Sequence, residues 1–262
     1  MTFQKTVGHE KQKRMFLLAL ENGRLAHAYA FAGEEGIGKT TFAVECAAIM
    51  GADPVLDLVL IDSTEPVSVE ETRNLRSRLA LSPAGKCKAA VIKAGLLTDE
   101  AASSILNLLE EPPAHSYIFL VTENFYSLLP TIASRVQKIV FAKSTDEEVR
   151  AIIPDEEIVK LAAGRIGFAK RLAENVEFLE FVRGCDRQFQ ILTEGRLHTR
   201  LQTAEKIAAL ETAQIKLFLQ FGMRRLSVLG SGVTLIRKFF TALADLDANV
   251  NTKIAIDNLF LP

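Results

Sequence analysis

The stretch Gly33-Glu-Glu-Gly36-Ile-Gly38-Lys39-Thr40 decides the fold, because its glycines, lysine and hydroxyl residue have the spacing of a phosphate-binding loop. A short apolar run, Tyr29-Ala30-Phe31-Ala32, precedes it, and a helical pattern over residues 40–50 follows it. In such a loop the backbone N–H groups face a phosphate, Lys39 reaches the terminal phosphates and Thr40 binds Mg²⁺. We therefore predict that nucleotide is bound by Gly33, Gly36, Gly38, Lys39 and Thr40. A retained loop that no longer binds nucleotide is the alternative.

Apolar runs of strand length recur along the first half of the chain, at residues 56–61, 89–92, 117–121 and 139–141, with helical patterns between them. Strands that alternate with helices indicate a parallel sheet covered on both faces. After residue 143 the pattern changes to helix upon helix. We predict an α/β domain over residues 1–143, a small helical lid over residues 144–176 and a C-terminal all-helical domain over residues 177–262.

Composition narrows the function classes. The chain has 262 residues, 48% of them hydrophobic, and a formal net charge of −1, which argues against a protein that binds DNA alone through a basic surface. It contains no run of eighteen apolar residues and begins without the pattern of a signal peptide, so we expect a cytoplasmic protein without a membrane span. Cys46, Cys87 and Cys185 are scattered, so we expect no zinc site and three small buried side chains.

The end of the third predicted strand argues against ATP hydrolysis. Phosphate-loop ATPases hold Mg²⁺ partly through an Asp at the end of a buried strand, and an adjacent acid often orients the attacking water. Here the strand at residues 89–92 runs into Lys93-Ala94-Gly95. Lys93 would repel Mg²⁺ and Ala94 cannot polarise water. We expect no self-contained hydrolysis, weak or absent ATP binding and little contribution from Mg²⁺.

Three further blocks carry a family resemblance. They are Asn22-Gly-Arg-Leu-Ala-His-Ala-Tyr-Ala-Phe-Ala-Gly33, Leu106-Asn-Leu-Leu-Glu-Glu-Pro-Pro113 and Pro130-Thr-Ile-Ala-Ser-Arg135. Together with the intervening sequence they make residues 5–141 resemble the AAA+ subunits of clamp loaders, above all the delta-prime type of bacterial DNA polymerase III and more distantly the gamma/tau and replication-factor-C types. The resemblance implies an AAA+ domain, a helical lid and a helical collar, the last shorter here than is usual in the family.

The resemblance also implies roles for two residues. Arg135 matches the arginine finger that completes the ATP site of a neighbouring subunit in trans, although Val136 replaces the cysteine that follows it in the family. A surface ion pair is the alternative for Arg135. Thr122 matches the sensor position at the end of the fourth strand. Glu110 and Glu111 match a family landmark, and a solvated pair of acids is their alternative explanation.

Three departures from the family distinguish this chain from its motor subunits. Lys93 and Ala94 replace the hydrolytic acids, the zinc-binding cysteines of many relatives are missing, and Gly167 stands where motors keep a second sensor arginine. Arg165 could take that part only in a shifted alignment. The resemblance therefore implies a non-motor subunit whose partners are gamma/tau-type motors and the delta subunit, with the sliding clamp and primer-template DNA reached through the complex. The alternatives are an ATP-hydrolysing motor subunit and a standalone phosphate-loop nucleotide-binding protein.

Overall fold

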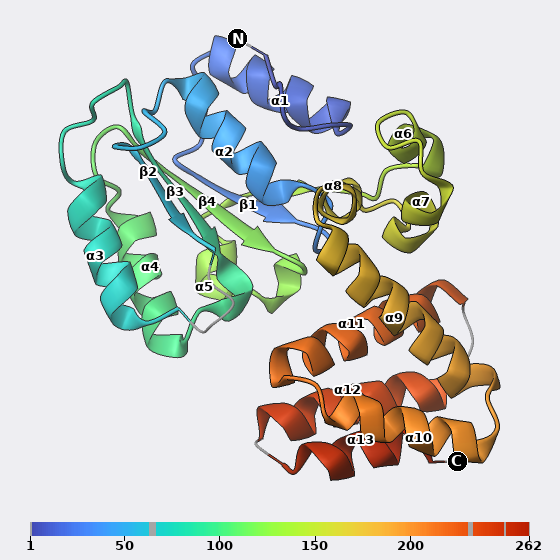
Figure 1. Cartoon of the computed structure of the whole chain (residues 1–262). Coiled ribbons are helices and arrows are strands. Elements are labelled where there is room, and N and C mark those ends of the chain that lie inside the picture. Colours follow the sequence, from blue (N-terminus) through green and yellow to red (C-terminus); the bar gives the residue numbers. More distant parts are fainter. Residues whose placement is uncertain (1, 63–66, 230–232, 249, 262) are drawn as a thin grey trace. The chain divides into compact units, whose positions relative to one another are not determined.

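A computed structural model describes residues 2–62, 67–229, 233–248 and 250–261 (Figure 1). The chain forms two compact units, Met1–Ala173 and Glu174–Pro262. Unit 1 contains the sheet with its covering helices, and unit 2 is helical throughout its described secondary structure. The predicted fold class, a parallel α/β domain followed by helices, is confirmed.

Unit 1 is built on a five-stranded sheet in the order β2-β3-β4-β1-β5, in which every neighbouring pair is parallel. The strands are β1 (Ala28–Ala32), β2 (Leu58–Ile61), β3 (Lys88–Lys93), β4 (Ser116–Thr122) and β5 (Gln137–Val140). Because all strands run the same way, their carboxyl ends meet at one edge of the sheet and their amino ends at the other. The phosphate loop follows β1 and therefore lies at the carboxyl edge.

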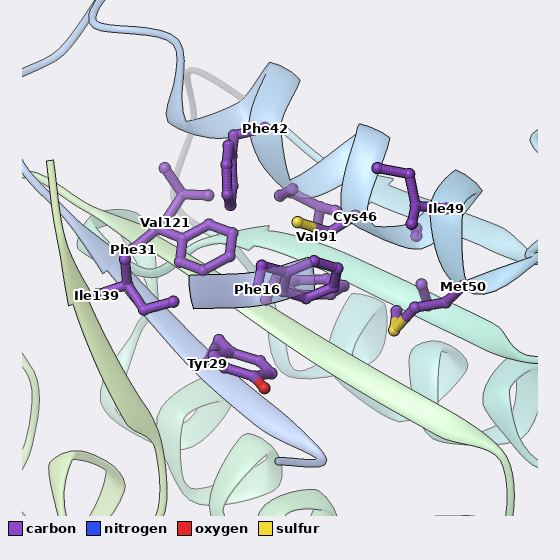
Figure 2. Close-up of a cluster of buried hydrophobic side chains, with 14 of the residues drawn as sticks. Phe16, Tyr29, Phe31, Phe42, Cys46, Ile49, Met50, Val91, Val121 and Ile139 are labelled. Atoms are coloured by element: carbon purple, nitrogen blue, oxygen red, sulfur yellow. The ribbon is translucent and has the colours of Figure 1, made fainter. Parts of the chain in front are cut away.

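Helices cover both faces of the sheet, and α1 and α2 lie on the face opposite to α3, α4 and α5 (Figure 1). These helices and the two short 3₁₀ turns are α1 (Glu10–Glu21), α2 (Lys39–Met50), α3 (Val69–Leu79), η1 (Ala94–Leu96), α4 (Asp99–Glu110), η2 (Phe125–Ser127) and α5 (Pro130–Ala133). Strand β1 alternates accordingly: Tyr29 and Phe31 point into an aromatic core beneath α2, whereas Ala28 and Ala30 point into an aliphatic core beneath α4. Figure 2 shows Phe42 of α2 packed over Phe31, with a ring-centroid distance of 5.3 Å.

Residues 144–173 complete unit 1 and include most of the predicted lid. They form α6 (Asp146–Arg150), α7 (Glu156–Ala162) and all but the last residue of α8 (Ile166–Glu174). Thr145 caps α6 in a reciprocal capping box with Glu148. The start of this segment is tied to the turn before α8, because Ser144 N–H donates to the carbonyl of Gly164 at 2.9 Å.

Unit 2 consists of α9 (Val176–Glu194), α10 (Leu197–Ala208), α11 (Thr212–Leu229), α12 (Val233–Asp247) and α13 (Thr252–Phe260). Its core is aromatic: Phe218 lies 6.0 Å from Phe239 and 6.4 Å from Phe260 between ring centroids. Gly222 on α11 makes room for this packing, because a Cβ there would lie 2.2 Å from the Phe239 ring. Within the described residues, no helix is long and apolar enough to span a bilayer.

Candidate functional site

The phosphate loop, residues 33–40, has a conformation that depends on its glycines. Gly36 and Gly38 adopt φ values of 80° and 101°, which residues other than glycine rarely adopt. Gly33 has φ 153°, and a Cβ there would lie 2.5 Å from the carbonyl oxygen of Phe141, so only glycine lets β1 turn into the loop at this point. The loop then leads directly into α2, where Lys39 is the first helical residue and the half-buried Thr40 the second.

The ammonium group of Lys39 lies on its own loop. The side chain is buried, and Nζ donates to the carbonyl oxygens of Gly33 at 2.5 Å and Glu34 at 2.6 Å. The ammonium group is thus hydrogen-bonded to the loop carbonyls, and Lys39 belongs to the first turn of α2, where the helix N-terminus stabilises an anion. The loop and Lys39 together thus have the groups that bind a phosphate.

Two other segments of unit 1 hold the loop. The N–H of Phe168, in the first turn of α8, donates to the carbonyl oxygen of Gly36 at 2.8 Å, and His9 Nε2 is 2.8 Å from the carbonyl oxygen of Ile37. The approach of α8 is close: a Cβ on Gly167 would lie 2.8 Å from the Gly36 oxygen and 3.4 Å from the Gly38 nitrogen. Gly167 therefore serves the packing of α8 on the loop. The sequence alone indicates only that Gly167 lacks the arginine side chain expected of a motor subunit at this position, and it does not reveal this packing contact.

Arg165 lies in the interior of unit 1, where its side chain contacts α7 and α8. It is buried, its Nε donates to the carbonyl of Ala162 at 2.9 Å and its Nη2 donates to that of Leu161 at 3.2 Å. Its guanidinium also lies 4.0 Å from the centroid of the Phe168 ring, within the range of a cation–π contact. Arg165 thus donates hydrogen bonds to the last carbonyl groups of α7 and also contacts Phe168 of α8, so it links these two helices.

Thr122 lies beside the phosphate loop at the end of β4, in register with Ala32 of β1. Its carbonyl accepts a hydrogen bond from Gly33 N–H at 3.2 Å. Its hydroxyl is buried and closes the following turn, donating to the carbonyl of Asn124 at 3.0 Å and accepting from the N–H of Asn124 at 3.3 Å. In this conformation the residue therefore meets the loop through its backbone.

The carboxyl end of β3 carries an ion pair. Lys93 is the last residue of the strand, and its Nζ lies 2.7 Å from Oδ1 of Asp62, which follows β2. The register places Lys93 beside Val121 and Val121 beside Phe31, so Lys93 stands two strands from β1, roughly 10 Å across the sheet. Ala94 comes next, as the first residue of η1. Sequence reasoning missed Asp62, although an acid directly after a predicted strand at this edge was a usable signal.

Arg135 lies at the opposite edge of the sheet from the phosphate loop. It precedes β5, whose first residue, Gln137, pairs with Tyr29, whereas Val140 pairs with Ala32 at the loop end. The four residues of β5 thus separate the two edges by roughly 13 Å. Arg135 and Lys39 are therefore not brought together in one site.

The guanidinium of Arg135 has partners in its own chain. Its Nη2 forms an ion pair with Oε1 of Glu110 at 2.8 Å, and its Nη1 donates to the Thr131 carbonyl at 2.9 Å and to the Ser134 hydroxyl at 3.1 Å. The surface ion pair that was the alternative explanation is thus present, and its acid is one of the two landmark glutamates. The other, Glu111, lies 3.4 Å from Arg76 of α3.

Comparison with known sequences finds similarity to subunits of DNA polymerase III. The family model described as DNA polymerase III, delta subunit, matches residues 52–145. The tau subunit of DNA polymerase III from Salmonella typhimurium is 31% identical over 171 residues, covering 57% of this chain and 27% of that protein. The gamma/tau subunit from Mycobacterium bovis is 28% identical over 176 residues, covering 58% and 30%. The chain thus spans less than a third of the length of these relatives.

Solved structures show the same fold over nearly the whole chain. A gamma subunit-related protein from Thermotoga maritima superposes with a TM-score of 0.61 at 20% identity, covering 96% of both chains. The RuvB Holliday junction branch migration motor from Thermotoga maritima gives a TM-score of 0.54 at 17% identity, covering 98% of this chain and 89% of that one. The fold is therefore the one that these two proteins share. Together with the sequence matches, it supports a clamp-loader family protein, similar to the gamma/tau subunits of DNA polymerase III over more than half of this chain.

Proposed function

We propose that the chain is a non-motor, delta-prime-type subunit of a clamp loader, which supports loading of the sliding clamp without hydrolysing ATP itself. The observation that carries this proposal is the Lys93–Asp62 ion pair of 2.7 Å at the carboxyl end of β3. A motor needs a carboxylate there to hold Mg²⁺. Here the strand ends in a cation, and the acid of the neighbouring strand is neutralised by it. The donor set at this edge does not fit Mg²⁺.

The groups of the phosphate loop are a lysine and backbone N–H donors, which suit the phosphates of a nucleotide rather than a metal ion. Lys39 and the amides at the start of α2 would bind the phosphate oxygens, and the loop glycines allow a close approach of the backbone. The nucleotide would meet α8 at Gly36 and Gly38, where Gly167 and Phe168 already pack. We therefore propose that ATP binds weakly or not at all, and that Mg²⁺ changes this little.

In the proposed assembly, Arg135 acts on the ATP site of an adjacent gamma/tau-type motor subunit. Its position at the edge of the sheet away from its own phosphate loop supports a role in trans. A guanidinium directed at the γ-phosphate of another chain stabilises the charge that develops during phosphoryl transfer. The delta subunit would be a second partner, and the clamp and primer-template DNA would be reached through the complex.

The competing function is an ATP-hydrolysing motor, which the intact phosphate loop and the gamma/tau relatives favour. One experiment separates the two. The purified chain is assayed for ATP hydrolysis, alone and after pulldown with the gamma/tau and delta subunits of the same organism. We expect specific association and negligible hydrolysis by the chain alone. Turnover at the rate of a motor by the purified chain would overturn the non-motor proposal, and failure to associate would overturn the clamp-loader assignment of partners.

A further inference from the structure

Arg135 lies in the turn just after α5 and is folded back against the end of that helix. Its Nη1 donates to the carbonyl of Thr131, four residues earlier, and to the hydroxyl of the preceding Ser134, at 2.9 and 3.1 Å. Its Nη2 is held by Oε1 of Glu110 at 2.8 Å. Both terminal nitrogens of the guanidinium therefore have partners within the chain. An arginine that reaches a phosphate on another protein uses the same N–H groups, so these contacts compete with that reach.

Glu110 is the partner that comes from a different element. It is the last residue of α4, whereas Thr131 and Ser134 belong to α5 and its end. The side chains of Arg135 and Glu110 remain 38% and 44% exposed, so a second chain could reach the pair. Exposed ion pairs are weak because water and salt screen them. A phosphate carries more charge than a carboxylate and can accept two N–H bonds from one arginine, so it can displace Glu110.

We propose that the Glu110 carboxylate holds the Arg135 side chain against α5, an ion pair that we call the parking contact. We further propose that the γ-phosphate of a nucleotide on the neighbouring subunit replaces Glu110 as the partner of the guanidinium. The inference rests on the proposed function of Arg135 in trans. It assigns Glu110 a regulatory role: the carboxylate holds the arginine back until a phosphate of sufficient charge is presented. Glu111 has no such role, because it lies beside Arg76 at 3.4 Å.

The neighbouring glutamate supplies a matched control. In a reconstituted loader, ATP hydrolysis is measured across ATP concentrations with the wild type, Glu110→Gln, Glu111→Gln, Arg135→Ala and the double change Glu110→Gln with Arg135→Ala. An exposed ion pair of this kind limits the effect to about fivefold. We expect Glu110→Gln to raise kcat by about two- to fivefold, Glu111→Gln to leave it unchanged, and the double variant to match Arg135→Ala. Equal effects of the two glutamate changes, a lower kcat for Glu110→Gln, or an effect that survives Arg135→Ala would overturn the inference.

A measurement on the chain alone keeps the parking contact separate from the role in trans. Phenylglyoxal modifies accessible arginines, and mass spectrometry gives the rate at Arg135. We expect Glu110→Gln to speed modification of Arg135 by about two- to fivefold and Glu111→Gln to leave it unchanged. If the labelling changes as expected but Arg135→Ala leaves loader hydrolysis intact, the proposed function in trans fails while the parking contact stands. If Glu110→Gln leaves the labelling unchanged, the parking contact itself is wrong.

Discussion

Asp57 and Lys88 form an ion pair in the interior of unit 1, with Nζ of Lys88 3.1 Å from Oδ1 of Asp57. The Asp57 carboxylate also accepts backbone hydrogen bonds from Gly85 at 2.7 Å, Ala84 at 2.9 Å and Asp53 at 3.1 Å. These bonds join the segment before β2 to the segment before β3. The buried Asp57 carboxylate therefore holds the loop that leads into β2 and the loop that leads into β3 in place together.

Stability should depend on the ionisation of Asp57. Burial alone would raise the pKa of its carboxyl, but the backbone N–H groups and the Lys88 ammonium lower the pKa well below its usual range. Since the folded-state pKa lies below the unfolded one, the contribution is present above about pH 4 and is lost as the pH falls below it. We expect urea midpoints of the wild type to drop between about pH 4 and about pH 2, and Asp57→Asn to be less stable at pH 7 with a flatter profile. Glu100→Gln on α4 is the control, and equal midpoints for Asp57→Asn and wild type at pH 7 would contradict this account.

Glu45 of α2 should anchor the N-terminal segment. Its carboxylate accepts from the backbone N–H groups of Gln4, Lys5 and Thr6 at 2.6, 2.7 and 2.7 Å. We expect Glu45→Ala to cost on the order of 2 kcal/mol of stability, because several bonds to a charged acceptor are lost. Hydrogen exchange should quicken at residues 4–6, whereas Glu10→Ala, which removes a surface pair with Lys13, should not change it. Unchanged exchange at residues 4–6 in Glu45→Ala would show that other contacts hold the segment.

Gly167→Ala should separate α8 from the phosphate loop. The added Cβ would lie 2.8 Å from the Gly36 oxygen, so the helix or the loop must shift, at a cost of about 1–3 kcal/mol. The hydrogen bond from Phe168 N–H to that oxygen should weaken, and exchange of the Phe168 amide is the direct readout. The control is Gly184→Ala on α9, where a Cβ meets nothing within 4 Å. A Phe168 amide that exchanges equally slowly in both variants would refute the contact.

Lys93 should determine how nucleotide binding responds to metal. With Lys93 paired to Asp62, calorimetric titration of the chain with a non-hydrolysable ATP analogue should give weak binding that is the same with and without Mg²⁺. Lys93→Asp places a carboxylate beside Asp62, and we expect binding to become Mg²⁺-dependent. Lys86→Asp, another lysine-to-aspartate change in the same unit, should leave it unaffected. Tight, strongly Mg²⁺-dependent binding by the wild type would contradict the proposed donor set.

In a reconstituted loader, Arg135→Ala should be more damaging than Lys39→Ala. Arginine fingers contribute roughly a thousandfold or more where fully engaged, and the net loss should be smaller because other sites in the ring keep their own. Neither change should give or remove hydrolysis by the chain alone. The measurement is the steady-state hydrolysis rate of loaders assembled with each variant. A greater loss from Lys39→Ala would mean that the phosphate loop is itself a working catalytic site.

Local signals made the fold predictable. The phosphate loop fixes a strand before it and a helix after it, and β1 and α2 lie there. The edge strand β5 was predicted at residues 139–141 and found at Gln137–Val140. Gln137 and Lys138 are exposed and polar, so they carry no apolar signal, and their pairing with β1 is what makes them strand.

The candidate site was less predictable because its interactions cross between elements. Lys93 was singled out from its place after a strand, but its partner Asp62 depends on β2 lying next to β3 in register. Likewise an ion pair was considered for Arg135 without a partner, because Glu110 is 25 positions away and meets it only when α4 and α5 pack together. Periodicity identifies elements and their buried faces. It does not say which charged ends become neighbours.

The placement of the phosphate loop and Arg135 at opposite edges of one sheet has a consequence for symmetry. A contact that brings the Arg135 edge of one chain to the loop edge of another joins two different surfaces, so it is heterologous. Such a contact differs from that of a two-fold dimer, in which both chains present the same patch. Repeated, it gives an assembly with a direction, in which each member has a distinct neighbour on either side and the chain at an end leaves one surface unmatched.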